Sequence, residues 1–175
     1  RIRDYIQTKI KDIKEEEKSF NNILPQLTKK YNHLKLKTNV EVFLGMEGFK
    51  TAFTIFFEES KKDKNLYVQG IVSKEKYPKY FEWLIYEVYN KRKELKLNTK
   101  KIVSEEARNE SLYSKDESKI KYLPFPLMTG IELLGEITML QLVSIEPFVI
   151  ILIRNKDLTE DLKRQFEFLW KIAKE

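Results

Sequence analysis

Apolar residues recur at alternating intervals of three and four along the first 34 residues of the chain. One series is Ile6, Ile13, Phe20, Leu27 and Leu34, and the companion series is Ile10, Leu24 and Tyr31, with Arg3 and Glu17 in its remaining places. This pattern over about four heptads is typical of a coiled coil. We therefore predict a helical arm over residues 1–38 that pairs two copies of the chain into a homodimer. The expected contact residues are Ile6, Ile10, Ile13, Phe20 and Leu24.

A second interpretation of this apolar stripe stays open, in which the amphipathic helix packs on its own domain. Pro25 ends or kinks the helix near Leu24, because proline lacks a backbone N–H and clashes with the preceding turn. The first segment can then pair with a second copy while the following segment docks.

From residue 39 onward the pattern changes to short strands separated by helices. Strands are expected at 39–45, 65–73, 98–104, 119–124, 131–144 and 147–155, and helices at 48–62, 77–95 and 158–174, with a loop or short helix at 105–118. Helices separate the early strands, whereas the late strands follow one another and two of them form a hairpin. We predict an α/β (α+β) domain over residues 39–175, in which helices flank a mixed β-sheet and the coiled-coil arm precedes it.

Charge is concentrated in the predicted arm. The chain carries a formal net charge of +6, and residues 1–38 hold ten Lys or Arg against five acidic residues. The remaining residues are therefore close to neutral. A globular domain that binds nucleic acid by itself carries its basic surplus on the folded surface, so the domain at 39–175 is a poor candidate for direct DNA binding.

Composition excludes several kinds of site. The chain has no cysteine, so it can form neither disulfides nor thiolate metal sites, and we expect no metal and no cofactor. Its apolar stretches are shorter than the roughly 20 residues of a membrane span. We expect a cytoplasmic protein that does not enter a membrane. Because the sequence starts at Arg1 inside a helical pattern, we also expect a preceding part of the protein.

A catalytic set is not apparent. The only histidine is His33, and "HLK" at 33–35 imitates the start of the phospholipase D signature, but the acid that should follow at position 40 is Val40. Nucleophile elbows, phosphate-binding loops and paired histidines at metal spacing are absent from the sequence. We predict that the chain is not an enzyme, with a phospholipase D-type phosphodiesterase and a pure dimerisation or protein-interaction module as the alternatives.

The segment "GMEGFK" at 45–50 is the clearest candidate for ligand contact. Its glycines let the chain leave a strand tightly and start a helix, whose first N–H groups can receive an anion or a hydroxyl group; a purely structural turn is the competing interpretation. Ligands of open α/β sheets bind beyond the carboxyl ends of the strands, which places any pocket near 45–48, 70–74 and 104–108. The candidate ligand-binding residues are Gly45, Glu47, Gly48, Ser73, Lys74, Ser104 and Arg108.

Three stretches resemble the TrmB-like archaeal transcription regulators. "VEVFLGMEGFKTAF" at 40–53 resembles the opening of their effector domain, and "YNKRKEL" at 89–95 resembles the segment that relates them to phospholipase D-like folds. "LKRQFEFLWKIAK" at 162–174 is similar to their closing helix, which ends in Phe-x-x-x-Trp, and the arm resembles their linker.

The resemblance implies a regulator whose C-terminal domain has a degenerate phospholipase D-like fold and senses a small effector, often a sugar. It implies dimerisation through the coiled coil, and DNA binding only through an N-terminal winged helix-turn-helix domain that these 175 residues lack. The additional sugar-binding region of longer family members is also missing. In this interpretation, an effector at the strand ends favours one packing of the domain against residues 20–38, and the arm passes that change to the DNA-binding domains.

Overall fold

The structure is a computed structural model of residues 1–175, and it divides into two units, Arg1–Lys37 and Thr38–Glu175. The described residues are 38–70, 80–108, 118–127, 129–142 and 147–175, together with helical positions between Ile2 and Asn21. Side chains at 80–85 are not included in this description.

The described positions of the first unit are helical, as the heptad pattern predicts. Four predicted contact residues, Ile6, Ile10, Ile13 and Phe20, expose 48–62% of their surface. Large apolar side chains at helical spacing thus face solvent in the isolated chain. Leu24 and Pro25 lie outside the described residues, and the pairing of two arms stays a prediction.

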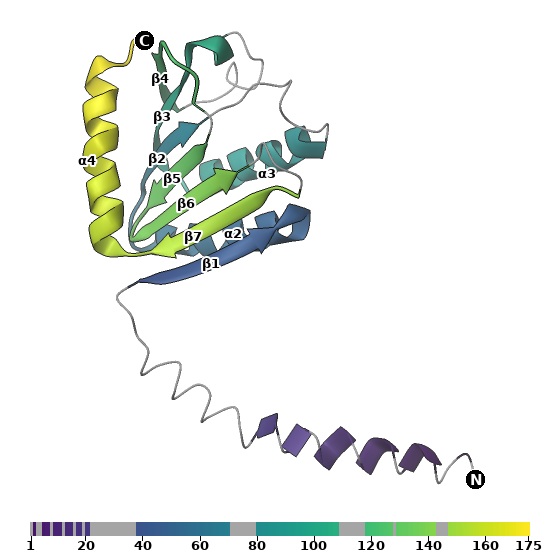
Figure 1. The fold of residues 1–175 in the computed structure, drawn as a ribbon. Coiled ribbons are helices and arrows are strands. Elements are labelled where there is room, and N and C mark those ends of the chain that lie inside the picture. The colour runs from purple at the N-terminus through teal and green to yellow at the C-terminus, as the bar shows by residue number, and fades with distance from the viewer. Residues whose placement is uncertain are drawn as a thin grey trace. The chain divides into compact units, whose positions relative to one another are not determined.

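The second unit carries one seven-stranded sheet with helices on both faces (Figure 1). Its strands are β1 (Asn39–Leu44), β2 (Asn65–Gly70), β3 (Asn98–Ser104), β4 (Lys119–Leu123), β5 (Gly130–Leu134), β6 (Ile137–Leu142) and β7 (Val149–Arg154). Its helices are α2 (Gly45–Glu58), α3 (Tyr80–Glu94) and α4 (Lys156–Ile172), with short 3₁₀ turns at Glu59–Lys61 and Glu105–Ala107.

The strand order β1-β7-β6-β5-β2-β3-β4 makes the sheet mixed. Strands β2, β3 and β4 pair in parallel, whereas β1–β7, β7–β6, β6–β5 and β5–β2 pair antiparallel. The stretch at 131–144, predicted as one strand, falls on two strands, β5 and β6, which form a hairpin with each other. The order also brings the first strand beside the last one, so that Asn39 pairs with Arg154.

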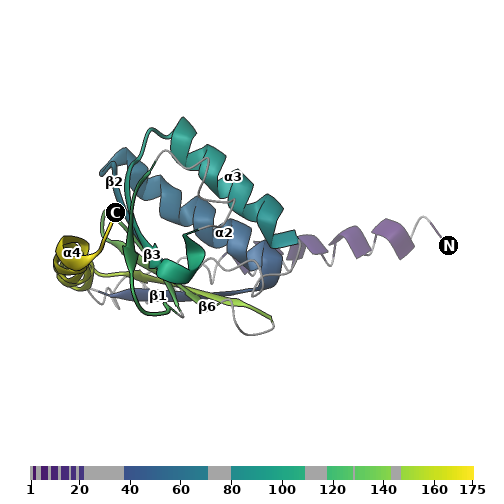
Figure 2. The same ribbon diagram turned by 90° about the horizontal axis from the view of Figure 1, so that it is seen from above.

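The helices form a layer on each face of the sheet. Figure 2 shows α2 and α3 side by side on one face and α4 on the opposite face. Helix α4 packs on β2, β5 and β6. Its start is fixed by Asn155, whose side-chain oxygen accepts a hydrogen bond from the Leu158 N–H at 2.9 Å, the usual N-cap arrangement.

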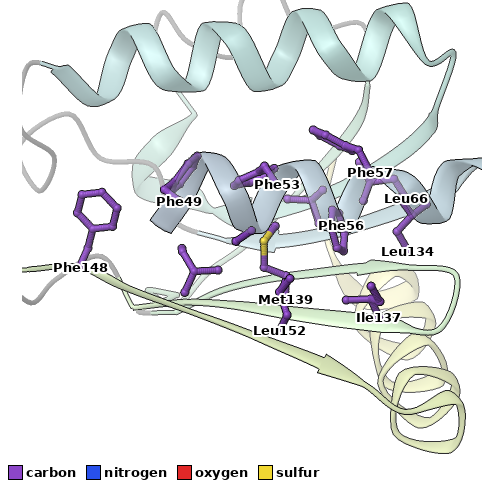
Figure 3. Close-up of a cluster of buried hydrophobic side chains, with 13 residues drawn as sticks. Phe49, Phe53, Phe56, Phe57, Leu66, Leu134, Ile137, Met139, Phe148 and Leu152 are labelled. Carbon is purple, nitrogen blue, oxygen red and sulfur yellow. The ribbon is translucent and has the colours of Figure 1, made fainter. Parts of the chain in front are cut away.

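Four phenylalanines of α2 form the centre of the core. Phe49, Phe53, Phe56 and Phe57 recur at helical spacing and are at most 7% exposed. They pack in edge and tilted contacts, with ring centroids 4.5 Å apart for Phe49 and Phe53, within the range that aromatic pairs favour. Figure 3 shows Phe56 directed from α2 toward the sheet residues Ile137 and Met139, whereas the rings of Phe53 and Phe57 lie on the side of α2 that faces the neighbouring helix.

A smaller apolar cluster holds α4 against the other face. Phe166 is 2% exposed and lies 5.2 Å from the Tyr67 ring, edge to face. Trp170 stacks on Phe166 one turn further along the helix. The face of α4 that carries Phe166 is therefore the face that packs on the sheet.

The mixed sheet flanked by helices confirms the predicted fold class, with shifted boundaries for α2 and for α4, which starts at Lys156 rather than at residue 158. Helix α2 starts at Gly45 rather than at residue 48, because Gly45 adopts a φ of +61° that turns the chain directly out of β1. Helix α3 is described from Tyr80. The segment predicted as a loop or short helix opens with the 3₁₀ turn Glu105–Ala107.

Candidate functional site

The strand directions place the three predicted ligand segments at one end of the sheet, but not side by side. Strands β1, β2, β3, β4 and β6 run in the same direction, so their carboxyl ends share an edge. Strands β2 and β3 are neighbours, which brings Gly70 and Ser104 to adjacent strand ends. Strands β7, β6 and β5 separate β1 from β2, so Gly45–Gly48 lies about 19 Å away at strand spacing.

The turn at Gly45–Gly48 requires glycine at both positions for structural reasons. The N–H of Gly45 donates to the Phe148 carbonyl at 2.9 Å, and its positive φ favours glycine. A Cβ on Gly48 would lie 3.0 Å from the carbonyl carbon of Phe43. Glu47, which is largely exposed, pairs with Lys50 at 3.2 Å. A carboxylate in the first turn of a helix opposes the binding of an anion there.

Ser104 and Arg108 make contacts within the chain. The Ser104 hydroxyl accepts from the Glu106 N–H at 3.3 Å and caps the 3₁₀ turn. The Arg108 guanidinium bonds to the Glu105 carboxylate, donates to the Glu175 carbonyl at 3.1 Å and lies 3.8 Å from the Tyr122 ring centroid. The bond to Glu105 raises the pKa of Arg108 and lowers that of Glu105. Ser73 and Lys74 lie outside the described residues, and ligand binding by all seven residues stays a prediction.

A buried polar cluster that the sequence did not indicate lies at the middle of β5, away from either edge of the sheet. Glu132 of β5 has a side chain that is only 5% exposed, and Arg92 reaches it from α3. The Arg92 Nη2 donates to Glu132 Oε1 at 2.6 Å, and the Gln141 amide of β6 donates to the same oxygen at 2.8 Å. We call these three residues the Glu132 cluster.

The Glu132 cluster leaves one acceptor and one donor unpaired. Among the described residues, nothing forms a hydrogen bond with buried Glu132 Oε2 or buried Arg92 Nε. Gly70 and Gly130 face each other beside the cluster, and a Cβ on Gly70 would lie 3.6 Å from the Gly130 Cα. Gly130 and Glu132 share a face of β5 by strand alternation. The two glycines contribute no side chain beside the ion pair, and the Gln141 side chain fills the space over Gly130, where a Cβ would lie 3.1 Å from the Gln141 Cβ.

The chemistry of the cluster fits a neutral, hydroxyl-bearing group. A hydroxyl group donates one hydrogen bond and accepts others, so a single hydroxyl can satisfy a free carboxylate oxygen and a free guanidinium N–H together. Unpaired buried polar atoms are costly, and satisfying them favours binding. A phosphate would gain from Arg92 but would be repelled by Glu132.

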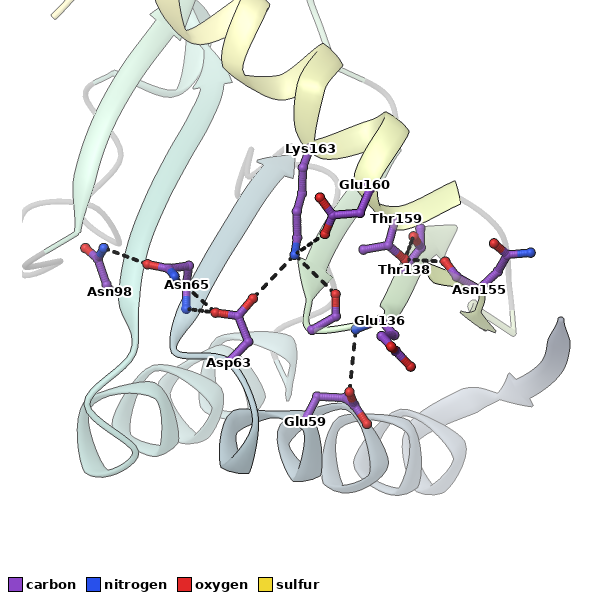
Figure 4. A network of polar contacts seen from close by, with 11 residues as sticks. Glu59, Asp63, Asn65, Asn98, Glu136, Thr138, Asn155, Thr159, Glu160 and Lys163 are labelled. Atoms are coloured by element: carbon purple, nitrogen blue, oxygen red, sulfur yellow. Dashed lines mark hydrogen bonds and ion pairs between the residues drawn. The ribbon is translucent and has the colours of Figure 1, made fainter. Parts of the chain in front are cut away.

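A second buried carboxylate, Glu59, lies at the end of the sheet opposite the predicted ligand segments and is fully bonded. Its side chain is 3% exposed and forms ion pairs with Arg154 and, at 3.2 Å, with Lys62. It also accepts from the Glu136 N–H at 3.5 Å (Figure 4). Burial raises the pKa of Glu59, but the hydrogen bonds and charges of Arg154 and Lys62 outweigh burial and hold that pKa below its usual value.

Lys163 of α4 extends this polar network to the end of α2. Its ammonium group donates to Asp63 at 3.3 Å, to Glu160 at 3.1 Å and to the Gly135 carbonyl at 3.2 Å (Figure 4). Burial raises the pKa of Asp63, but the Asn65 N–H and Lys163 lower it further than burial raises it. These bonds tie α4 and the β5–β6 turn to α2. We call Glu59, Asp63, Arg154 and Lys163, with their partners, the Glu59 network, and its role is structural.

The described residues form neither a metal-binding cluster nor a helix suited to cross a membrane. Within the described ranges, no group of three or more His, Asp or Glu residues is arranged to hold a metal ion. No helix among the same residues has the length and apolar character needed to cross a membrane.

Known proteins resemble this chain in structure and not in sequence. No protein-family model matches it, and no curated protein matches it significantly. TrmBL2, an archaeal chromatin protein with a novel mode of DNA binding, aligns with 99% of this chain and 68% of its own length, at 14% identity and a TM-score of 0.51.

Two further solved structures share the fold of the second unit. NucT from Helicobacter pylori aligns with 78% of this chain and 98% of its own length, at 8% identity and a TM-score of 0.55. Nuc from Salmonella typhimurium, a phospholipase D family member, aligns with 78% of this chain and 97% of its own length, at 11% identity and a TM-score of 0.52. At these identities the likeness concerns the fold alone, and the chain has a phospholipase D-like α+β fold.

Proposed function

We propose that the chain is the dimerisation and effector-sensing part of a TrmB-like transcription regulator. The observation that carries the proposal is the extent of the match to TrmBL2, which includes nearly the whole chain, arm and sheet together. NucT and Nuc each match 78% of the chain, whereas the unit from Thr38 to Glu175 makes up 138 of the 175 residues. An arm joined to this fold therefore favours the regulator over the phosphodiesterase.

In this proposal the chain acts on DNA through a winged helix-turn-helix domain outside the 175 residues. The near-neutral charge after residue 38 supports this division, because phosphate contacts need clustered basic side chains. The apolar stripe of the arm, exposed at Ile6, Ile10, Ile13 and Phe20, supports homodimerisation. Two linked DNA-binding domains would then read a two-part site.

The Glu132 cluster is the effector site of this proposal. It lies in the middle of the sheet, two residues along β5 from the strand end at Gly130, and its free acceptor and donor suit the hydroxyl groups of a sugar or another polyol. Arg92 belongs to α3, and Val88 of this helix and Leu95 directly after it pack on the phenylalanine core. An effector that engages Arg92 would bias the position of α3, and such a two-state element is what relay to another domain requires.

Thermal denaturation in the presence of candidate effectors tests the sensor role. The full chain is heated with monosaccharides, disaccharides, nucleotides or sugar phosphates, since a ligand of the native state raises stability by RT ln(1 + [L]/Kd). We expect a rise with one hydroxyl-rich class, and we expect Arg92→Met/Glu132→Met to lose it while the chain still folds. Absence of any rise across the panel would favour a pure dimerisation module.

Analytical ultracentrifugation tests the arm. Ile10→Asp/Ile13→Asp places two charges on the predicted seam, and the matched control Lys11→Asp/Lys14→Asp changes neighbouring positions off the seam. We expect the seam variant to become monomeric and the control to remain dimeric. Equal association of the two variants would show that the seam is assigned wrongly.

A phosphodiesterase assay tests the proposal that the chain is not an enzyme. His33 is the only histidine of the sequence, and it lies outside the described residues. We expect no hydrolysis of bis(p-nitrophenyl) phosphate above background. Activity that disappears in His33→Ala would establish the alternative.

A further inference from the structure

On the side that carries α4, the described residues of the second unit leave the half of the sheet formed by β1 and β7 exposed. Val40, Val42 and Leu44 of β1 expose 54%, 60% and 59% of their surface. Their register partners on β7 are Ile153, Ile151 and Val149, each partly exposed. Cross-strand partners lie on the same face of a sheet, so these six side chains form one surface, which we call the open face.

The open face continues onto β6 and ends where α4 begins. Ile151 pairs with Leu140 and Val149 pairs with Leu142, both partly exposed. The next pair is different, because Thr138 is fully buried and its hydroxyl bonds to Thr159 of α4 at 3.0 Å. Figure 1 shows β1 and β7 extending away from α4, and Figure 2 shows that α2 and α3 cover the other side.

The chemistry of the open face is unusual for a surface. Each of its side chains is Val, Ile or Leu, and none is charged. The water-exposed face of an antiparallel sheet normally carries polar residues. Edge strands are normally protected against pairing with other chains by a charge, a proline or a bulge. The opposite side of β1 is mixed, because Phe43 packs on the core cluster while Asn39 and the exposed Glu41 are polar.

We propose that the open face packs against the open face of a second copy of this chain, as a second contact of the homodimer; this inference rests on the proposed pairing of the arms. A charge-free surface offers nothing to select a charged partner, whereas two Val- and Ile-rich faces stack well on each other. Sheets stack about 10 Å apart with interdigitating side chains. A two-fold axis through the face makes the patch its own complement.

The small size of the open face favours, as its binding partner, a second copy of the chain that the paired arms already hold nearby. The eight same-face residues on β1, β7 and β6 cover roughly 260 Å² at strand spacing, and a stable interface needs about 800 Å² from each partner. The face alone is too small to hold a separate protein firmly. Paired arms add apolar area at Ile6, Ile10, Ile13 and Phe20 and raise the effective concentration of the second face, so a small patch suffices.

Substitutions on β1 test the second contact in the full chain. Val40→Lys/Val42→Lys adds two charges to the open face at positions that are more than half exposed, so folding is retained. The matched control Tyr86→Lys/Phe168→Lys removes two equally exposed aromatic residues, 62% and 66%, from α3 and α4. Sedimentation equilibrium is expected to give a dimer Kd at least tenfold higher for the open-face variant and within twofold of the original chain for the control.

Cross-linking supplies a readout that does not depend on affinity. The sequence has no cysteine, so Val42→Cys and Phe168→Cys each introduce one thiol per chain. A short bis-maleimide is expected to link two copies through Cys at position 42 and not through Cys at position 168. Circular dichroism and thermal denaturation verify that every variant is folded.

The outcomes separate this inference from the proposed function. If the original chain is dimeric and both lysine variants keep its Kd, the open face is not a dimer contact and the arms alone pair. If the open-face variant weakens the dimer while Ile10→Asp/Ile13→Asp leaves it unchanged, the face is a contact and the arm assignment is wrong. A chain that is monomeric at all concentrations overturns both.

Discussion

The two buried carboxylates of the sheet differ in how completely they are bonded. Glu59 has two cationic partners and a backbone N–H, whereas Glu132 uses one oxygen for both of its partners and leaves the other unpaired. A fully satisfied buried group stabilises a fold, and a half-satisfied one costs stability. This difference indicates that the Glu59 network holds elements together, whereas the Glu132 cluster keeps one acceptor and one donor that form no hydrogen bond.

A substitution that disturbs the Glu59 network should cause the largest loss in the free energy of unfolding. A Cβ on Gly135 would lie 2.6 Å from Glu59 Oε2, and Gly135 has a φ of +57°. Gly135→Ala combines left-handed strain with displacement of a buried carboxylate, and we expect a loss of about 3 kcal/mol in the free energy of unfolding. Gly45→Ala is the matched control, with φ +61° and open space, and it should lose about 1 kcal/mol. Urea denaturation at one protein concentration measures both, and equal losses would contradict the assignment.

Neutralising the satisfied carboxylate should have the next largest effect. Glu59→Gln leaves Arg154 and Lys62 without their shared anion, and we expect a loss of about 2 kcal/mol, below the value for a fully buried pair because both cations are partly exposed. Glu58→Gln, which removes an exposed partner of Lys61, should change stability by less than about 0.5 kcal/mol. A Glu59→Gln variant as stable as Glu58→Gln would show that the Glu59 network contributes little.

Low pH should reduce the stability that Glu59 and Asp63 contribute to the folded chain. The pKa values of Glu59 and Asp63 are lowered in the folded chain, so the unfolded chain binds protons first as pH falls. The stability that these groups contribute is complete above their usual values of 4.5 and 3.8 and is lost as pH falls through the folded values. Urea midpoints between pH 7 and pH 3 should fall on the acid side, and Glu59→Gln should flatten that fall. Parallel curves would exclude Glu59 as a cause.

Replacing the incompletely bonded pair should have the smallest effect. Arg92→Met/Glu132→Met removes two unpaired buried atoms together with the ion pair, and apolar replacement of a buried pair is often neutral or stabilising. We expect the free energy of unfolding to stay within about 1 kcal/mol of the original chain. The matched variant Arg154→Met/Glu59→Met should lose about 2 kcal/mol, because Lys62 and the Glu136 N–H lose their acceptor. A comparable loss in both variants would make the Glu132 cluster structural as well.

Local patterns in the sequence predicted the elements of the second unit. Alternation in "NVEVFL" and the spacing of Phe49, Phe53 and Phe56 are set by the period of one strand or one helix, so they can be recognised without knowing the fold. The strand order could not be predicted in this way. Pairing of β1 with β7 depends on contacts more than 100 residues apart, about which a local period gives no information.

The same limit explains why the Glu132 cluster was missed. Arg92 and Glu132 lie 40 residues apart, and Arg92 looks like one more charge in a basic stretch. The available signal was Glu132 itself, a lone acid in "GIELL" at a position whose strand neighbours are buried. Ser104 and Arg108 were recognisable as polar residues at the end of a strand and after it. In the structure, the Ser104 hydroxyl caps the following 3₁₀ turn and Arg108 forms an ion pair with Glu105.

The pairing of the first strand with the last also sets the order of events during synthesis. Val149 emerges from the ribosome 105 residues after Leu44, its partner in the sheet, and at 5–20 residues per second that interval is roughly 5–20 s. Throughout this time β1 has apolar side chains along one face, Phe43 on the other and an unpaired backbone. The newly made chain therefore exposes an aggregation-prone segment until its final strand is made, and rapid synthesis or early chaperone binding should increase the yield of folded protein.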